Sequence, residues 1–368
     1  MHLSHRSSVS TSIPFTGDVF FGRSIIDRFR ERCQMDESLE TARRQMIALE
    51  EEAHKMIVGM DEVIRLTLIC LCSGRGSHIL LEGVPGIGKT ELVKTIAAAV
   101  NVDFSRIQLM PDTQPHDISG YELLDQRTNK YYFKHGPIFA SFVLADEINR
   151  ATSKTASAML EAMQEGQVST DFSGAFQLPQ PFMVFATQNP IEQEGTYELA
   201  EAQKDRFLMK ALVNYPTHEE AIRIAELNSM SDRKLVKPLL DSEQILKIRL
   251  NIERHVHVES EVTRQAMRLV ELTRPDSSTV KVVRDNVKQG GSPRAQIGLI
   301  RAAKARAVFE ERDYVTPQDI ITLAKPILRH RVLFDRPARS PVGREEQFVS
   351  MLDQVIDAAF SSQDLAHA

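Results

Sequence analysis

Residues 83–90 are Gly83-Val84-Pro85-Gly86-Ile87-Gly88-Lys89-Thr90. They fit the pattern G-x-x-x-x-G-K-[ST] of a phosphate-binding loop. Glycines let backbone N–H groups approach phosphate oxygens closely, and the helix start that follows adds partial positive charge. The stretch therefore predicts that Lys89 reaches the β- and γ-phosphates and that the Thr90 hydroxyl ligates Mg²⁺.

The flanks of this loop agree with the interpretation. His78-Ile79-Leu80-Leu81 predicts a short apolar strand before it. A helix is predicted from Glu91 to Val100, with Leu92, Ile96 and Ala99 on one face. The alternative is an ordinary Gly/Pro turn ahead of an amphipathic helix. The eight-residue match with both flanks in place argues against it.

Composition sets broad limits. The chain has 368 residues, enough for two or three domains, and a net charge of −5, which gives no global basic signal for nucleic acid. Its three cysteines form no metal quartet or disulfide framework, which favours a reducing, cytoplasmic location. No apolar run of about 18 residues predicts a membrane span. Residues 1–36 lack a secretory apolar region and are expected to form a poorly ordered extension.

An acidic pair follows a second apolar run. Phe142 to Ala145 predicts a buried strand that ends in Asp146-Glu147. Ligands of open α/β sheets bind beyond the carboxyl ends of the strands. We therefore expect Asp146 to position Mg²⁺, commonly through water, and Glu147 to polarise the water that attacks the γ-phosphate. Alone, such a run is usually a solvated strand end. Downstream of a phosphate loop it indicates a nucleotide hydrolase.

Three polar side chains are further candidates. Asn189 follows an apolar strand predicted at 182–187 and could sense the γ-phosphate, although Asn-Pro is commonly a turn starter. Arg206 precedes the strand predicted at 207–213 and is either a surface cation or an arginine finger. Arg294 opposes the dipole of a helix that starts at Ser292-Pro293. We interpret it as closing on bound phosphate, with an ordinary surface arginine as the alternative.

The remaining pattern divides the chain by element type. Other elements predicted before residue 216 are helices at 39–56, 61–72 and 156–165, a strand at 104–109 and a hairpin at 167–177. From Pro216 onward the pattern predicts helices without strands, with connections at 233–238 and 275–291. Thr316-Pro317 marks another helix start.

These residues together resemble an AAA+ ATPase, and more narrowly the MoxR family. The resemblance covers the chain from about Glu37 to past Arg331. It is carried by GVPGIGKT as Walker A, FVLADEINR at 142–150 as Walker B, and the strings RIQLMPD, GPIFA, LEAMQEGQV, ATQNP, EAQKDRF and GGSPRA.

The resemblance implies roles for individual residues. Asn189 corresponds to sensor 1, Arg206 to the arginine finger and Arg294 to sensor 2. The adenine pocket corresponds to Ile57, Val58 and Gly59, and further nucleotide contacts are expected from Gly83, Pro85, Gly86, Ile87, Gly88, Lys89, Thr90 and Glu91. Met60 departs from the Gln or Glu that the family usually has after this glycine, which puts one local polar contact in doubt.

The resemblance also implies an α/β fold, a doubly wound parallel sheet with a C-terminal all-helical lid. The expected division is an extension at 1–36, a nucleotide domain at 37–216, a lid at 217–335 and a helical tail at 336–368. ATP, Mg²⁺, a ring that is usually hexameric and a partner with a von Willebrand factor A domain are implied, with chaperone-like work in maturing proteins or inserting their cofactors. A magnesium-chelatase motor subunit, a nucleic-acid motor and a nucleotide-gated binding module remain alternatives, and the client stays unidentified.

Overall fold

The structure is a computed structural model that describes residues 36–190, 199–229, 236–338 and 340–360. The predicted N-terminal extension lies outside the described residues, apart from Asp36. The same is true of residues 233–235, at the start of one predicted connection.

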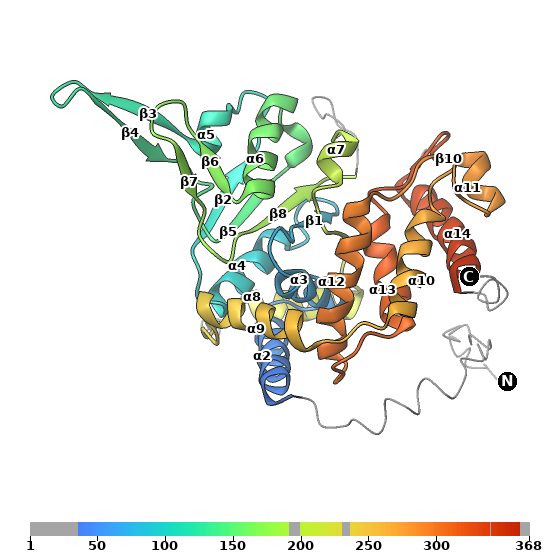
Figure 1. Cartoon of the computed structure of the whole chain (residues 1–368). Helices are drawn as coiled ribbons and strands as arrows, with labels where there is room; N and C mark the ends of the chain where they lie inside the picture. Colours follow the sequence, from blue (N-terminus) through green and yellow to red (C-terminus); the bar gives the residue numbers. More distant parts are fainter. Residues whose placement is uncertain (1–35, 191–198, 230–235, 339, 361–368) are drawn as a thin grey trace, which may run out of the picture. The chain divides into compact units, whose positions relative to one another are not determined.

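A parallel sheet of five strands forms the centre of the nucleotide domain (Figure 1). Its strands, in spatial order, are β2 (Phe104–Gln108), β5 (Phe142–Asp146), β8 (Met183–Gln188), β1 (Ile79–Glu82) and β9 (Met209–Leu212). Every neighbouring pair is parallel, so the carboxyl ends of all five strands meet at one edge. This confirms the predicted sheet and each of its strands to within two residues at either end.

Helices cover both faces of the sheet (Figure 1). On one side lie α2 (Glu37–His54), α3 (Asp61–Cys72) and α4 (Lys89–Ala99), and on the other α5 (Pro115–Ser119) and α6 (Ser153–Glu165). A 3₁₀ turn, η1 (Ile148–Arg150), follows β5 and precedes α6. The predicted stripe of α2 is buried at Leu39, Ala42, Met46, Leu49 and Ala53.

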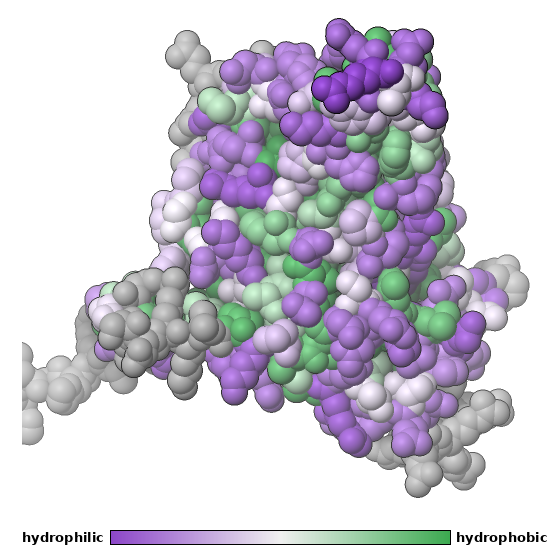
Figure 2. Space-filling view, turned by 90° about the vertical axis from the view of Figure 1, so that its left-hand side faces the viewer, coloured by the Kyte–Doolittle hydropathy of each residue, from purple (hydrophilic) through white to green (hydrophobic). Residues whose placement is uncertain are grey.

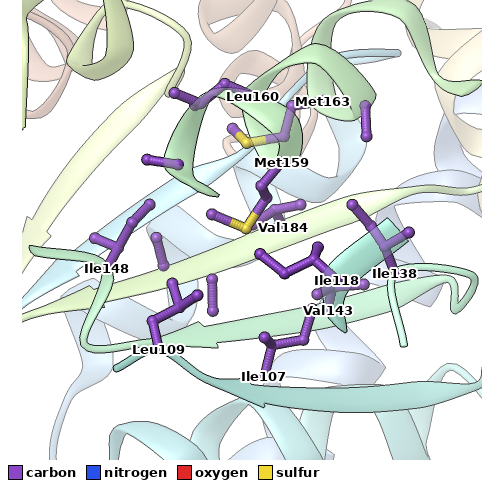
Figure 3. Close-up of a cluster of buried hydrophobic side chains, with 14 of the residues drawn as sticks. Ile107, Leu109, Ile118, Ile138, Val143, Ile148, Met159, Leu160, Met163 and Val184 are labelled. Carbon is purple, nitrogen blue, oxygen red and sulfur yellow. The ribbon is translucent and has the colours of Figure 1, made fainter. Parts of the chain in front are cut away.

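The core under α6 shows why the sheet is apolar on both faces. Val143 and Val184 point toward Met159 and Met163 of α6 (Figure 3). Because side chains alternate along a strand, the intervening residues are buried on the opposite face. Phe142 and Phe185 are among these, with ring centroids 5.3 Å apart. Burial on both faces explains the continuous apolar runs in the sequence.

Two hairpins extend from this domain. The predicted one is confirmed as β6 (Gln167–Ser169) paired antiparallel with β7 (Ala175–Gln177). The other, β3 (Gly120–Asp125) with β4 (Lys130–His135), was not predicted and projects beyond the sheet (Figure 1). The rings of Tyr131 and Phe172 stack at 4.4 Å and join the two hairpins.

The region after β9 is mainly helical, as predicted. Its helices are α8 (His218–Ser229), α9 (Ser242–His255), α10 (Ser260–Glu271), α11 (Lys281–Asn286), α12 (Pro293–Phe309), α13 (Pro317–Leu328) and α14 (Pro341–Phe360). The short helix α7 (Glu201–Lys204) lies before β9.

Two predictions for this region are wrong in detail. The strands β10 (Val287–Gln289) and β11 (Leu333–Phe334) pair antiparallel, although no strand was expected. Residues 275–291 are also more than a connection, because they contain α11 and β10. The strands β10 and β11 are too short to show a hydrophobic period in the sequence. The partner of β10 is also distant in the sequence, so no local pattern marks it.

The predicted helix starts are confirmed. The Ser292 hydroxyl accepts the N–H of Arg294 at 3.1 Å, with Pro293 in the first turn of α12. Thr316 and Asp319 form a reciprocal capping box at the start of α13. These caps satisfy N–H groups that have no partner within the helix.

Candidate active site

The phosphate loop leaves the carboxyl end of β1 and leads into α4. The Gly83 N–H donates to the Gln188 carbonyl at the end of β8, with an N···O distance of 3.1 Å. The Lys89 ammonium donates to the Gly83 carbonyl and so spans the loop. Gly86 and Gly88 have φ angles of 83° and 91°, values that favour glycine. The loop therefore has the backbone that its sequence predicts.

Close packing explains why position 83 is glycine. A Cβ atom there would lie 2.4 Å from the Val213 carbonyl oxygen and 2.7 Å from a side-chain carbon of Ile87. Ile87 is buried beneath the loop, while Pro85 and Gly86 are exposed at its tip. The tip is thus open to a ligand, and its base is fixed by packing.

Asp146 ends β5 beside this loop. The Thr187 hydroxyl of the adjacent strand β8 donates to Asp146 Oδ1 at 2.6 Å. Arg106 of β2 donates two N–H groups to Asp146 Oδ2, one of them at 3.1 Å. The neighbouring strands therefore hold the carboxylate at the edge where the sequence placed it.

Glu147 follows in a left-handed backbone conformation, with a φ of 58°. Its N–H donates to Thr187 Oγ1 at 2.9 Å, and its carboxylate lies 3.0 Å from Arg150 Nε. A residue other than glycine in this region costs energy and is retained where the surrounding structure requires it. The turn gives Glu147 a direction different from that of Asp146, although the two are adjacent.

The Lys89 ammonium lies in a partly buried, acidic environment. Burial lowers its pKa below the ordinary lysine value, and the neighbouring carboxylates of Asp146, Glu82 and Glu147 oppose that shift. Glu82 is in turn paired with Lys210 at 2.8 Å. The Lys89 ammonium therefore lies in the field of carboxylates from the ends of β1 and β5.

The predicted adenine-pocket residues line a cavity of about 480 Å³. Ile57, Val58 and Gly59 form one wall, and α8 contributes Glu220 and Arg223 to the lining. Met60, the residue that departs from the family pattern, directs its terminal methyl group toward the loop. This methyl carbon would lie 3.3 Å from a Cβ atom at Gly88. The Met60 side chain thus lies beside Gly88 of the phosphate loop.

Asn189 directly follows β8, which lies between β5 and β1. This order places its backbone between the strand that ends in Asp146 and the strand that leads into the phosphate loop. Asn189 is half-buried.

The other two predicted residues lie together. Arg206 Nε donates to the Gln164 amide oxygen of α6 at 3.3 Å, and Arg294 donates to the same oxygen at 3.1 Å. Arg294 also lies 3.7 Å from the Asp205 carboxylate. The helical region therefore brings Arg294 to Arg206. Within the described residues, Arg294 contacts Ser292, Gln164 and Asp205 and not the phosphate loop.

Sequence reasoning assigned no role to several residues that hold this site. Arg106, Thr187, Gln164 and Asp205 orient the predicted groups through the bonds given above. All four lie within the strings that carry the family resemblance, namely RIQLMPD, ATQNP, LEAMQEGQV and EAQKDRF. Membership of these strings was the available signal, but a string does not show which side chains meet.

Two absences apply to the described part of the chain. No group of three or more His, Cys, Asp and Glu side chains there could hold a metal ion by itself. No helix within the same residues is long and apolar enough to cross a membrane.

This chain matches two known protein-family models and is similar in sequence to known bacterial proteins. Residues 78–209 match the model of the "ATPase family associated with various cellular activities (AAA)", and residues 281–351 match that of the AAA lid domain. Chaperone MoxR1 of Mycobacterium tuberculosis is 42% identical over 283 residues, which cover 77% of this chain and 74% of that protein. The uncharacterized protein YeaC of Bacillus subtilis is 39% identical over 290 residues, 78% of this chain and 87% of that protein.

A solved structure is similar over nearly the whole chain. It is a putative ATPase from Cytophaga hutchinsonii, which is 36% identical and superimposes with a TM-score of 0.77. The match covers 91% of this chain and 98% of that one.

Proposed function

Since this chain belongs to the MoxR family of AAA+ ATPases and hydrolyses ATP, we propose that it works as a ring, in which each ATP site is completed by an arginine of the neighbouring subunit. The ring drives chaperone-like remodelling of partner proteins, including their maturation or the insertion of cofactors. The Mycobacterium tuberculosis relative is named a chaperone, which supports this class of work.

The observation that carries the ring proposal is the position of Arg206 relative to the sheet. The phosphate loop follows the carboxyl end of β1, whereas Arg206 precedes the amino end of β9. These two strands are neighbours and run parallel, with Ile79 opposite Met209 and Glu82 opposite Leu212. Arg206 therefore lies at the opposite edge of the sheet from its own loop. Four strand residues separate the two edges by about 13 Å.

Such an arginine suits the phosphate of a neighbouring subunit. Arg294 shares the Gln164 oxygen with Arg206, so we assign both guanidinium groups to the same neighbouring site. Two cations there would stabilise charge that develops on the transferred phosphoryl group. One face of the molecule also carries a central band of hydrophobic and neutral residues within a hydrophilic surround, which suits a surface buried on assembly (Figure 2).

Within each subunit, the other residues have separate tasks. Lys89 binds the β- and γ-phosphates, Glu147 polarises the attacking water, and Asn189 positions that water or senses the γ-phosphate. The adenine base of ATP occupies the cavity lined by Ile57, Val58 and Gly59.

Thr90 and Asp146 fit a magnesium site. Hydroxyl and carboxylate oxygens are the donors that this ion prefers, and it commonly uses few protein ligands. Thr187 and Arg106 already engage both Asp146 oxygens, so contact through a water suits the geometry. When bound, the ion neutralises charge on the phosphates.

The test of the ring proposal uses two inactive variants. Glu147→Gln should bind ATP but lose about 10²-fold or more in turnover, because an amide cannot accept the proton. Arg206→Ala should also bind ATP and lose about 10³-fold or more. When the two are mixed, Glu147→Gln subunits can lend Arg206 to neighbours with an intact Glu147. Partial turnover should therefore return.

The matched control is the double variant Arg206→Ala/Glu147→Gln, which has no arginine to lend and should not rescue Arg206→Ala. If the single variants exchange subunits and their mixture stays inactive, Arg206 does not act between subunits. The ring proposal would then be wrong.

We also propose a partner with a von Willebrand factor A domain and a cytoplasmic location. Family membership supports the partner, and the buried free thiols of Cys70 and Cys72 suit a reducing compartment. Glu147→Gln should retain such a partner in ATP, whereas Lys89→Ala should not. Recovery of equal amounts of that partner by both variants would count against ATP-dependent engagement.

A further inference from the structure

Arg331 is a buried arginine for which the proposed ATP site has no role. It lies just after α13 in the helical region and is only 5% exposed. Burial lowers its pKa from the ordinary arginine value, and the Asp205 carboxylate opposes this shift. Because a buried guanidinium needs a partner for every N–H group, its partners indicate what it organises.

All five donors of Arg331 have acceptors. Nε donates to Asp205 Oδ1 at 2.8 Å, and Nη1 donates to the Ile327 carbonyl near the end of α13. The remaining N–H groups donate to the carbonyls of Asp205 at 3.1 Å, Phe207 at 2.6 Å and Leu208 at 3.0 Å. Four of the five bonds therefore end on residues 205, 207 and 208, on both sides of Arg206.

The same short segment is fixed by other contacts. The Ser292 hydroxyl at the start of α12 donates to Asp205 Oδ1 at 2.7 Å, and a ring nitrogen of His330 lies 2.9 Å from the Phe207 carbonyl. Two residues after Arg206, the Leu208 N–H donates to the His78 carbonyl at 2.8 Å. This bond starts the pairing of β9 with β1. The backbone at Arg206 is thus held between the helical region and the sheet.

From these contacts we propose that Arg331 is a positioning residue for Arg206. It fixes the backbone of residues 205–208 so that the Arg206 guanidinium faces the neighbouring ATP site. The inference rests on the proposed action of Arg206 between subunits. It adds that the helical region sets the position of the arginine that a subunit lends, and not the hydrolytic groups of its own site.

An arginine is needed for this geometry. Its planar fork presents five donors in fixed directions, whereas lysine has three on a flexible stem. Arg331→Lys keeps the charge but has only three donors on a flexible stem, so it cannot make all five of these bonds. Because small displacements of a positioning group can cost about 10²-fold in rate, we expect a kcat loss of that order with a nearly unchanged KM for ATP.

Mixing separates this role from a general loss of structure. Arg331→Lys should recover turnover with Glu147→Gln, which lends a correctly held Arg206. It should recover no turnover with Arg206→Ala, because neither variant lends a competent arginine. A subunit damaged in its own ATP site would not be rescued by Glu147→Gln.

Arg312→Lys is the matched control. Arg312 also binds a carboxylate in the helical region, that of Asp319 at 2.7 Å. Within the described residues its side-chain hydrogen bonds go to residues 314–319 and not to residues 205–208. It should lower melting temperature without the selective pattern of rescue. If Arg331→Lys does not fold, Asp205→Asn weakens the same link while leaving the carbonyl acceptors in place, and it should show the same pattern.

Each unfavourable outcome has its own meaning. If Arg331→Lys keeps kcat within about twofold of wild type, or is rescued by Arg206→Ala as well as by Glu147→Gln, this inference is overturned while the ring proposal stands. If the reference mixture of Arg206→Ala and Glu147→Gln stays inactive, the ring proposal fails and this inference fails with it.

Discussion

Lys89 illustrates the opposing demands on a single residue in this site. The loop packs around it, which lowers its pKa, yet the carboxylates of Asp146, Glu82 and Glu147 favour its charged form. Its ammonium donates to the Gly83 carbonyl, so the cation that would meet phosphate also holds the loop in shape.

Lys89→Ala should therefore abolish measurable ATP binding and turnover, because it removes the loop's cation and its internal bond. Calorimetry and phosphate release measure the two quantities. Lys94→Ala is the control, since Lys94 is an exposed lysine on the same helix. Wild-type affinity and turnover in Lys89→Ala would contradict the assignment of the loop.

His78, just before β1, makes stability depend on pH. Its Nδ1 accepts the Val184 N–H at 3.0 Å and its Nε2 lies 3.0 Å from the Met163 carbonyl, which requires the neutral ring. Burial lowers its pKa from 6.5 to about 4. The unfolded chain therefore binds a proton in this range that the folded chain does not. The stabilisation is present above pH 6.5 and falls as pH decreases toward 4.

At pH 5, the His78 contribution to the free energy of unfolding should be lower than at pH 7 by about 2 kcal/mol. Urea unfolding at both pH values measures it. His78→Gln can replace both hydrogen bonds without titrating, so its decrease should be smaller by that amount. Some dependence should remain, because burial also lowers the pKa of His330. Equal decreases in the two proteins would refute the role of His78.

At the scale of elements, the start of α13 is fixed by one carboxylate. Asp319 is fully buried, caps the helix through the Thr316 N–H at 2.8 Å, and accepts from both Arg306 and Arg312. Burial raises its pKa, but hydrogen bonds from Arg312 and Thr316 outweigh this and hold the pKa below the ordinary aspartate value. The helix start and two arginines thus depend on the same side chain.

Asp319→Ala should lower the free energy of unfolding by about 3–5 kcal/mol, because it leaves two guanidinium groups without their carboxylate. Denaturant titration monitored by circular dichroism measures the loss. Thr316→Ala removes only one cap and should cost about 1 kcal/mol. Similar losses for the two variants would show that the ion pairs add little to the cap.

The elements that could be predicted are those with a clear period or a strong local signal. The strands at 142–145 and 182–187 were marked by apolar runs, and the starts of α12 and α13 by Ser-Pro and Thr-Pro. The β3–β4 hairpin was missed because its aromatic residues pack on the second hairpin, a contact that no local pattern shows.

In the candidate site, too, some features follow from local motifs and others depend on contacts between distant residues. Local motifs were sufficient to place Lys89 and Asp146 at one edge of the sheet, which the structure confirms. Nothing local connects Arg331 with Asp205, which is 126 positions away. The meeting of Arg206 and Arg294 at Gln164 likewise depends on how the helical region packs, and the sequence contains no period that encodes it.

For the whole molecule, the ring proposal makes turnover depend on protein concentration. On dilution to concentrations at which subunits dissociate, turnover per chain should fall toward the rate of a site without the neighbour's Arg206. That rate is about 10³-fold lower. The affinity of each chain for ATP should change little, since Lys89 and the adenine pocket belong to one subunit. Serial dilution with both measurements tests this. Constant turnover per chain in a sample shown to be monomeric would contradict shared sites.

The placement of the phosphate loop and Arg206 at opposite edges of the sheet determines how many complete ATP sites an assembly contains. On the proposed arrangement, each contact between two chains has a giving side and a receiving side, so chains associate head to tail. An open arc would always end in one chain whose loop lacks a donor. Only closure would make the number of complete sites equal to the number of chains. Ring closure would then be worth one additional active site, a gain that is largest, per chain, in the smallest assemblies.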